Sequence, residues 1–299
     1  MGYEKEIGRT KMGYATNRSE MDLEPSSKPA VAADQALILA VETSSRVGSA
    51  ALARGPLLLE ELRFSAPMQH SSELFPVLDT LLKNHHCVPA DLDQAYIAIG
   101  PGSFTGLRIA VTLAKTMHLA NGVQIVTVDS LDVVAANLAD MADDGVGDRG
   151  HRAVVPDRIA ALFDAKRGQF YAGIYQRLRP PADASPGDQD DQDPGYRIPG
   201  PDNSLWQKVT PDLLMTAREI VTDFAGTALL GLLGDGLLHH RDEFPPDRTI
   251  LLPQSCWSPR AANVHRLGYQ KALAGRFAEP LGLTPFYLRG PEVTVRKNP

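Results

Sequence analysis

The chain has 299 residues, of which 43% are hydrophobic and 22% are charged, and its formal net charge at pH 7 is -6. This length fits one large domain or two modest ones, and the negative charge argues against a chain that grips nucleic acid alone, because affinity for phosphates comes from clustered Lys and Arg. No apolar run is long enough to span a membrane, and Cys87 and Cys256 belong to no disulfide or zinc motif. We therefore expect a cytoplasmic protein with reduced thiols.

Two segments have the composition of disordered chain. Residues 1–35 are polar and aperiodic, which predicts a disordered extension, and Met1, Met12 and Met21 are all possible starts. Residues 179–203 are rich in Pro, Gly and Asp, which predicts a disordered surface insertion.

The first ordered elements are two short apolar runs, Ala36–Val41 and Val47–Ala53, whose spacing predicts a β-hairpin. Its tip carries hydroxyls and backbone amides that offer a phosphate-facing loop, at Glu42, Thr43, Ser44 and Ser45. The same residues also suit an ordinary turn, so both interpretations stay open.

An amphipathic helix is predicted over Ser71–Lys83, because apolar residues recur there at helical spacing. We expect Ser71 or Ser72 as the N-cap and Pro76 near the first turn. His70 precedes this helix and has the place of a capping or surface residue.

A glycine-rich turn over Gly100–Gly106 lies between a predicted strand, Tyr96–Ile99, and a predicted helix, Leu107–Leu119. The turn is not a P-loop, because no Lys follows Gly106, and Thr105 breaks the dinucleotide fingerprint. Tight packing and anion binding at the helix N-terminus both remain open. The candidate residues are Gly100, Gly102, Ser103, Thr105, Gly106 and Arg108.

Further strands are predicted over Val123–Val128, Ile159–Asp164, Gln169–Tyr175 and Leu229–Leu233, the last leading into Gly234, Asp235 and Gly236. Strands that alternate with helices predict an α/β fold. We expect no metal site, because the pairs His85–His86 and His239–His240 are sequence neighbours that do not face one ligand.

Several blocks in fixed order resemble the signature blocks of the TsaB (YeaZ) family. They are Leu37–Ser44, His70–Leu74, Gly100–Ile109, Asp164–Tyr171, Gly234–Gly236 and Pro285–Arg289. The resemblance covers about residues 36–291 and leaves out the N-terminal extension and the insertion.

The resemblance implies an α/β actin-like (ASKHA, ribonuclease H-like) fold with two lobes and mixed sheets. The expected first lobe comprises residues 36–132 plus 261–299, and the second comprises residues 133–260. Residues Glu42 to Ser45 and Gly234 to Gly236 would then be the degenerate phosphate loops.

The family's catalytic relative TsaD carries a metal-binding His-x-x-x-His, where this chain has Ser130 and Val134. Neither residue replaces an imidazole ligand. The resemblance therefore implies a subunit without catalytic residues that binds and activates TsaD for N6-threonylcarbamoylation of adenosine 37 in tRNA.

The resemblance also implies partners: a homodimer alone, a heterodimer with TsaD, TsaE joining them and TsaC supplying the activated group. It implies no tightly bound cofactor, with ATP or ADP at most at the TsaD interface, and contact with tRNA mainly through the complex. The expected four-helix interface uses His70, Leu74, Leu78, Leu81, Leu107 and Val111. Alternatively, these apolar stripes are buried within the chain itself.

A rival function is an active actin-like ATPase or phosphotransferase that uses the two phosphate loops, with Glu42 and Asp235 as its carboxylates. A glycoprotease-like metallopeptidase is a weaker rival, because both His positions are lost.

Overall fold

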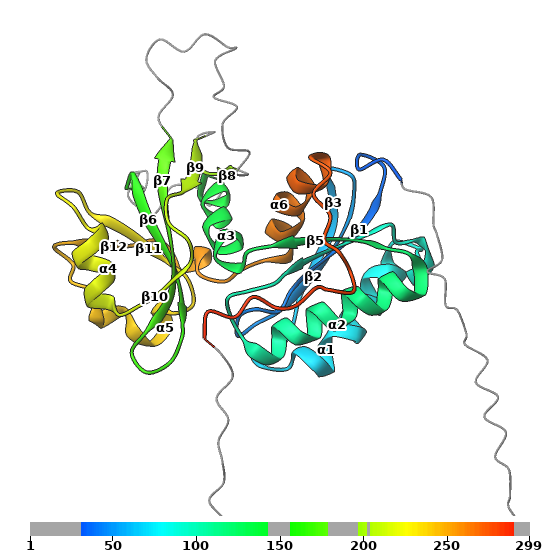
Figure 1. Cartoon of the computed structure of the whole chain (residues 1–299), viewed down its shortest axis with the longest axis horizontal. Helices are drawn as coiled ribbons and strands as arrows, with labels where there is room; N and C mark the ends of the chain where they lie inside the picture. The colour runs from blue at the N-terminus through cyan, green and yellow to red at the C-terminus, as the bar shows by residue number, and fades with distance from the viewer. Residues whose placement is uncertain (1–30, 143–155, 179–196, 202–203, 290–299) are drawn as a thin grey trace, which may run out of the picture.

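The computed structural model describes residues 31–142, 156–178, 197–201 and 204–289. They form two lobes, each built on one mixed sheet with helices against it (Figure 1). The α/β class predicted from the sequence is confirmed.

The first lobe contains a five-stranded sheet in the order β3-β2-β1-β4-β5. β1 pairs antiparallel with β2, as the predicted hairpin requires, and parallel with β4. Its strands are β1 (Leu37–Glu42), β2 (Ser49–Arg54), β3 (Leu57–Arg63), β4 (Gln94–Ala98) and β5 (Gln124–Val128).

Helices cover both faces of this sheet. Successive side chains of a strand point to opposite faces, so Leu37 and Leu39 belong to one buried cluster and Ile38 and Ala40 to another. The first cluster packs under α1 (His70–Asn84) and α2 (Phe104–Asn121). The second packs under α6 (Ala261–Leu273), which returns from the far end of the chain (Figure 1).

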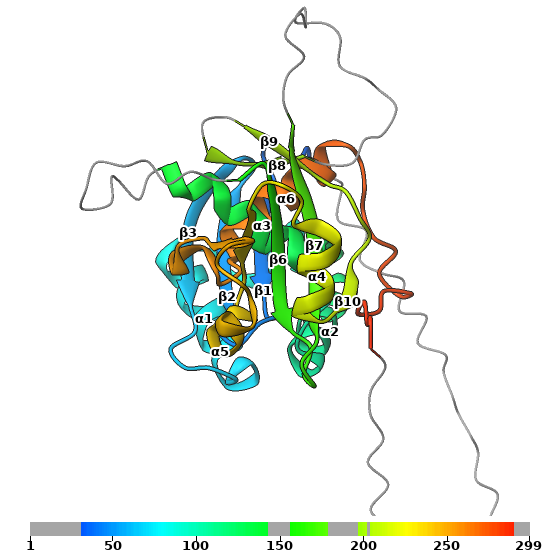
Figure 2. The same cartoon turned by 90° about the vertical axis from the view of Figure 1, so that its left-hand side faces the viewer.

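The second lobe has seven strands, six of them in the order β12-β11-β6-β7-β9-β8, while β10 pairs with β7. Figure 2 shows α4 in front of β6 and β7. The strands are β6 (Arg158–Asp164), β7 (Phe170–Leu178), β8 (Ile198–Pro199), β9 (Leu205–Lys208), β10 (Leu213–Met215), β11 (Leu230–Leu233) and β12 (Thr249–Leu251). The helices are α4 (Ala217–Phe224) and α5 (Leu237–His240).

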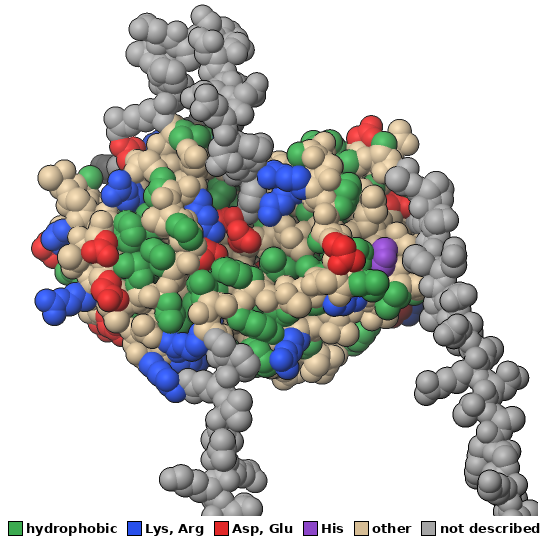
Figure 3. All heavy atoms as spheres, in the orientation of Figure 1, with side chains coloured by type: hydrophobic (Ala, Val, Ile, Leu, Met, Phe, Trp, Pro, Cys, Tyr) green, Lys and Arg blue, Asp and Glu red, His purple; other side chains and the backbone are tan. Residues whose placement is uncertain are grey.

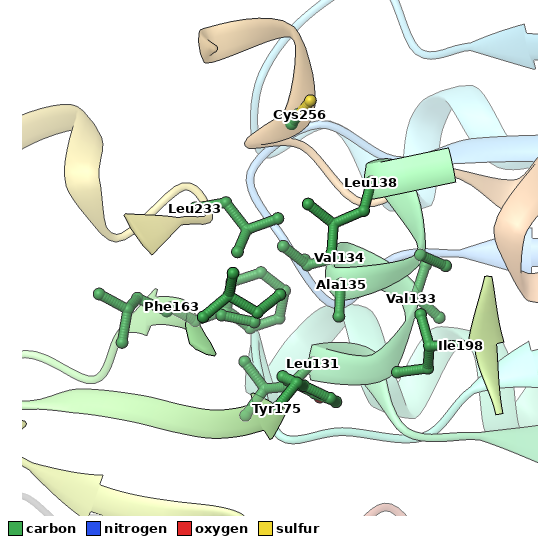
Figure 4. Packing of buried hydrophobic residues seen from close by; sticks show 14 of the residues in the cluster. Leu131, Val133, Val134, Ala135, Leu138, Phe163, Tyr175, Ile198, Leu233 and Cys256 are labelled. Atoms are coloured by element: carbon green, nitrogen blue, oxygen red, sulfur yellow. The ribbon is translucent and has the colours of Figure 1, made fainter. Parts of the chain in front are cut away.

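Helix α3 (Ser130–Ala135) joins the two lobes. Its Leu131 and Val134 lie against Phe163, Tyr175 and Leu233 of the second lobe (Figure 4). The same buried cluster includes β1 and α6 residues, so one continuous core runs through both lobes. The expected lobe boundary between residues 132 and 133 falls inside this helix.

Two helix starts differ from the prediction. α1 begins at His70 after Gln69, and neither Ser71 nor Ser72 is its N-cap. Pro76 lies inside that helix, not at its start. α2 begins at Phe104 because Ser103 caps it, its hydroxyl accepting from the Gly106 amide, so the glycine-rich turn is shorter than predicted.

Most of residues 1–35 and of 179–203 lie outside the described residues. The parts that are described are ordered. Ile198 is buried in β8, which pairs with β9, and Val31 and Ala33 pack against the core. Both segments were therefore predicted too long. No helix among the described residues is long and apolar enough to cross a membrane.

Candidate functional site at the lobe junction

The loop after β1 meets the second lobe at Arg46. The backbone amide of Arg46 donates to Asp235 Oδ2 at 3.4 Å, and Arg46 Nη1 lies 2.9 Å from His239 Nε2. The structure thus brings together the two segments that the sequence analysis named as degenerate phosphate loops, which lie almost 200 residues apart in the chain. It joins them by direct contact between the lobes.

The polar groups of the first loop face inward. Thr43 Oγ1 donates to the Gly106 carbonyl at 2.8 Å, and Ser44 Oγ donates to Glu42 Oε1 at 2.6 Å. Ser45 Oγ reaches the Val47 carbonyl at 3.3 Å, and all four residues from Glu42 to Ser45 are buried. In this structure the three hydroxyls bond within the protein, which favours the ordinary-turn interpretation over the phosphate-facing one.

The glycine-rich turn packs directly on this loop. A Cβ atom on Gly102 would lie 2.3 Å from the Ser44 carbonyl oxygen, and one on Gly106 would lie 1.8 Å from that of Thr43. The Ser103 amide also donates to the Ser44 carbonyl at 2.7 Å. Glycine is needed here for close backbone approach, which is the tight-packing interpretation. Gly100 is buried in the turn, whereas Thr105 and Arg108 are exposed on α2.

On the second-lobe side, Gly234 has a φ of 119° and approaches β6 so closely that a Cβ would lie 2.1 Å from the Leu162 carbonyl oxygen. The Gly236 amide donates to that same carbonyl at 3.1 Å. This turn fixes Asp235 toward Arg46, so these two glycines shape the lobe contact.

Two carboxyl groups lie at the junction, of which Glu42 is buried and Asp235 is half-buried. Burial raises the pKa of Glu42 to about 7, against the opposing effect of its hydrogen bonds from Ser44. Burial likewise raises the pKa of Asp235 to about 6, against the opposing effect of Arg46. Among the described residues, Glu42 Oε2 has no hydrogen-bond partner, so ionisation of Glu42 costs stability.

We expect Glu42→Gln to stabilise the chain by about 1 to 3 kcal/mol near pH 8. The unfolded Glu42 releases its proton at about pH 4.5 and the folded one at about pH 7. The wild type therefore loses stability as pH rises through that window, whereas Gln keeps the acceptor for Ser44 and never ionises. Urea unfolding at several pH values measures this.

At about pH 4 the two proteins should have equal stability, because Glu42 is then protonated in both states. Glu219 provides a control, since hydrogen bonds from Thr216 lower its pKa at an exposed helix start. Glu219→Gln should not stabilise at any pH. A Glu42→Gln difference that is the same at all pH values contradicts the assignment.

The predicted partner-interface residues are buried within this chain. Leu74, Leu81 and Leu107 are 0% exposed, Leu78 is 8% and Val111 is 6% exposed. His70 is buried too, with its Nε2 2.9 Å from the Ser45 carbonyl oxygen. Leu74, Leu78, Leu81 and Val111 belong to the apolar cluster between α1, α2 and the sheet. Because all six side chains are buried, the isolated chain does not present them as an exposed interface. The alternative of stripes buried within the chain holds.

The outward faces of α1 and α2 present other residues. Phe75, an apolar residue of α1, is 65% exposed. Pro76 is exposed beside it, and Val77 is half-buried. Phe75 stands one position away from Leu74, a rotation of about 100° around the helix, and that angle is the signal that separates the two faces.

A charged cluster that sequence analysis missed lies between α3 and β9. Lys208 Nζ is 2.9 Å from Asp132 Oδ1, 2.5 Å from Asp212 Oδ1 and 3.8 Å from Asp129 Oδ2. Tyr175 also donates to Asp132 at 2.6 Å. Although burial opposes it, the charges of Asp132 and Asp212 raise the pKa of Lys208. The cluster joins residues more than 70 positions apart.

No group of three or more His, Cys, Asp or Glu in the described part of the chain is arranged to hold a metal ion. The two positions that the family resemblance matches to metal ligands of TsaD lie in the core. Ser130 and Val134 are both 0% exposed, and Ser130 Oγ accepts from the Gly100 amide at 3.1 Å.

A family model described as TsaD, tRNA N6-adenosine threonylcarbamoyltransferase, matches residues 65–195. The chain is 30% identical over 264 residues to the Bacillus subtilis tRNA threonylcarbamoyladenosine biosynthesis protein TsaB, covering 87% of this chain and 96% of that one. It is also 26% identical over 140 residues to the Escherichia coli protein of the same name, covering 47% and 55%.

Among solved structures, the chain resembles YeaZ from Pseudomonas aeruginosa, with a TM-score of 0.63 and 21% identity over 85% of this chain and 100% of that one. A second structure, described as an uncharacterized protein with similarity to peptidase YEAZ from Pseudomonas aeruginosa, gives a TM-score of 0.64 at 22% identity, with the same coverage. The two-lobed α/β chain has the actin-like fold. Its extended similarity to the Bacillus subtilis protein places it in the TsaB family of tRNA threonylcarbamoyladenosine biosynthesis proteins.

Proposed function

We propose that this chain is a non-catalytic subunit that binds TsaD and activates it for N6-threonylcarbamoylation of adenosine 37 in tRNA. The observation that carries the proposal is the contact between the lobes at Arg46, Asp235 and His239. In the ATPase alternative, phosphates would have to fit between the two loops that this contact joins.

The chemistry of the junction also favours a subunit over an ATPase. Phosphoryl transfer needs Mg²⁺ held by carboxylates and donors aimed at the phosphates. Here Glu42 accepts from Ser44 inside its own loop, and burial favours its protonated form. The hydroxyl of Thr43 likewise donates a hydrogen bond to the Gly106 carbonyl in α2.

The partner surface that we propose is the outward face of α1 and α2. It presents Phe75 and Pro76 together with small polar residues such as Thr105 and Thr112. An exposed aromatic side chain on a helix suits the centre of a helix-to-helix interface. Alone, the chain would pair with a second copy through this face, and TsaD would replace that copy.

The same proposal gives the other components their places. TsaE joins the heterodimer, TsaC supplies the threonylcarbamoyl group as an adenylate, and tRNA is held mainly by the complex. ATP or ADP would bind at most at the TsaD interface, with no tightly bound cofactor in this chain.

We expect Phe75→Asp to weaken association with TsaD by more than about tenfold, because it places a charge at the centre of the apolar contact. The variant should stay folded, since Phe75 is 65% exposed in the isolated chain. Sedimentation measures association, circular dichroism measures folding, and a reconstituted reaction with TsaD, TsaE and TsaC measures tRNA modification.

Leu57→Asp is the matched control, because Leu57 on β3 is 64% exposed and lies off both helices. It should associate with TsaD like the wild type. A folded Phe75→Asp chain that still supports full modification contradicts the proposed surface. ATP hydrolysis by the purified chain without TsaD would favour the ATPase alternative instead.

A further inference from the structure

The last described residues, 276–289, form an extended strap that runs from α6 along α2 to the second lobe (Figure 1). The Ala278 amide donates to the Ile125 carbonyl and the Phe286 amide to the Ile99 carbonyl, both at 2.8 Å. Lys115 Nζ donates to the Leu281 carbonyl, also at 2.8 Å. The strap therefore carries its last residues to the lobe junction.

At that end the strap meets the start of α2. The ring of Tyr287 stacks on Phe104 with 4.9 Å between ring centres. The guanidinium of Arg108 lies 3.8 Å from the centre of the Phe104 ring, and its Nε donates to Tyr287 Oη at 3.3 Å. Two aromatic rings and one cation thus form a single cluster of stacked groups.

The strap then reaches the turn between β6 and β7. Arg289 donates to the Ala165 carbonyl and to Gln169 Oε1. The tip of this turn presents Lys166 and Arg167, both exposed and both with positive φ, at 67° and 59°. Non-glycine residues in this conformation cost free energy, and such residues concentrate at functional sites.

These three segments place four cations on one surface, which we call the strap surface: Phe104, Arg108, Lys166, Arg167, Tyr287 and Arg289. In the contacts above, Arg108 and Arg289 donate hydrogen bonds to uncharged groups, and those contacts therefore do not neutralise their positive charges. Lys166 pairs with Asp164 at 2.6 Å, yet its side chain is 79% exposed. Figure 3 shows Lys and Arg side chains on both sides of the end of the described chain.

This local charge opposes that of the whole chain, which has 36 acidic and 30 basic residues. Cations interleaved with aromatic rings are the chemistry that binds unpaired RNA, since guanidinium and ammonium groups contact phosphates while rings and guanidinium planes stack on bases. An acidic protein segment would pair with the cations, but it has no bases that could stack on the two aromatic rings.

We propose that the strap surface binds single-stranded RNA, and that its occupant is the loop of the tRNA that the complex modifies. The proposal rests on the proposed function, because it gives this subunit a direct contact with the substrate held by its partner. It predicts that the chain contributes RNA affinity through residues outside the Phe75 face.

The test is a fluorescence anisotropy titration of a labelled, unmodified anticodon stem-loop RNA with the heterodimer of this chain and TsaD. We expect the double variant Arg108→Ala, Arg167→Ala to bind the RNA roughly tenfold more weakly. The slope of log K plotted against log salt concentration should become shallower by about one unit for each cation removed. Tyr287→Leu should weaken binding about fivefold with the salt dependence unchanged.

Arg63→Ala with Arg218→Ala is the matched control, because both residues are exposed on other elements, β3 and α4. Association with TsaD is measured separately without RNA. Variants that bind TsaD normally but keep wild-type RNA affinity overturn this inference and leave the proposed function standing. Poly-glutamate that binds as tightly as the RNA, and loses affinity in the same variants, also overturns it.

If the wild-type chain does not bind TsaD, the proposed function fails, and the titration is repeated with the chain alone. Binding of the RNA by the chain, weakened in the double variant, then still supports the strap surface. Equal binding by both overturns it.

Discussion

Replacing Lys208 by Met is expected to lower the free energy of unfolding by about 3 to 5 kcal/mol. The Lys208 ammonium neutralises Asp132 and Asp212, whose side chains are only 4% and 3% exposed. Without it, these buried carboxylates lose their closest opposite charge, although Lys271 and a hydrogen bond from Tyr175 still act on Asp132. Removing one member of a buried ion pair costs far more than the intact pair contributes.

Urea unfolding near neutral pH measures this change, and Lys166→Met is the matched control. Lys166 pairs with Asp164 at 2.6 Å, but its side chain is 79% exposed, so its loss should cost at most about 1 kcal/mol. The deficit of Lys208→Met should shrink near pH 5, because burial raises the pKa of Asp212 to about 6 and this carboxyl takes up a proton there. A loss below about 1 kcal/mol would show that the cluster is hydrated.

Gly106→Ala is expected to cost about 3 to 5 kcal/mol, at the upper end for one added methyl group. The added Cβ would lie 1.8 Å from the carbonyl oxygen of Thr43. This oxygen is a backbone atom, so it cannot rotate out of the way as a side chain could. The clash can be relieved only by moving α2 away from the loop after β1. That movement would also break the 2.8 Å bond from Thr43 Oγ1 to the Gly106 carbonyl.

Gly226→Ala is the control for this substitution. No described atom lies within 4 Å of a Cβ built at Gly226, and its φ is outside the left-handed region, so the change should be nearly neutral. Thermal and urea unfolding of both variants decide the matter. If Gly106→Ala is as stable as Gly226→Ala, the close packing of α2 on the loop does not limit the fold.

Local patterns predicted the elements well. The hairpin of β1 and β2 and the two strands that flank Lys166 follow from short-range signals. Helix starts were less accurate, because a cap depends on which side chain reaches a free amide. Ser103 does so for α2, whereas Ser71 and Ser72 lie inside α1.

The candidate site depended on long-range contacts that no local pattern encodes. An apolar stripe such as Leu74, Leu78 and Leu81 fits a partner or the chain's own sheet equally well, and only the packed fold decides. The Lys208 cluster and the Arg46 contact join residues far apart in sequence. The family resemblance found the two loops, but not that they close on each other.

The position of α6 has a consequence for how the chain is made. This helix covers the face of the first sheet that carries Ile38, Ala40 and Tyr96, yet it begins only at Ala261. On a ribosome, the first lobe cannot bury that face until almost the whole chain has emerged. One apolar face of its sheet therefore stays exposed to solvent while the second lobe is synthesised. Folding of the N-terminal half is thus completed by the C-terminal end, and a chain cut short before α6 leaves that surface free to aggregate.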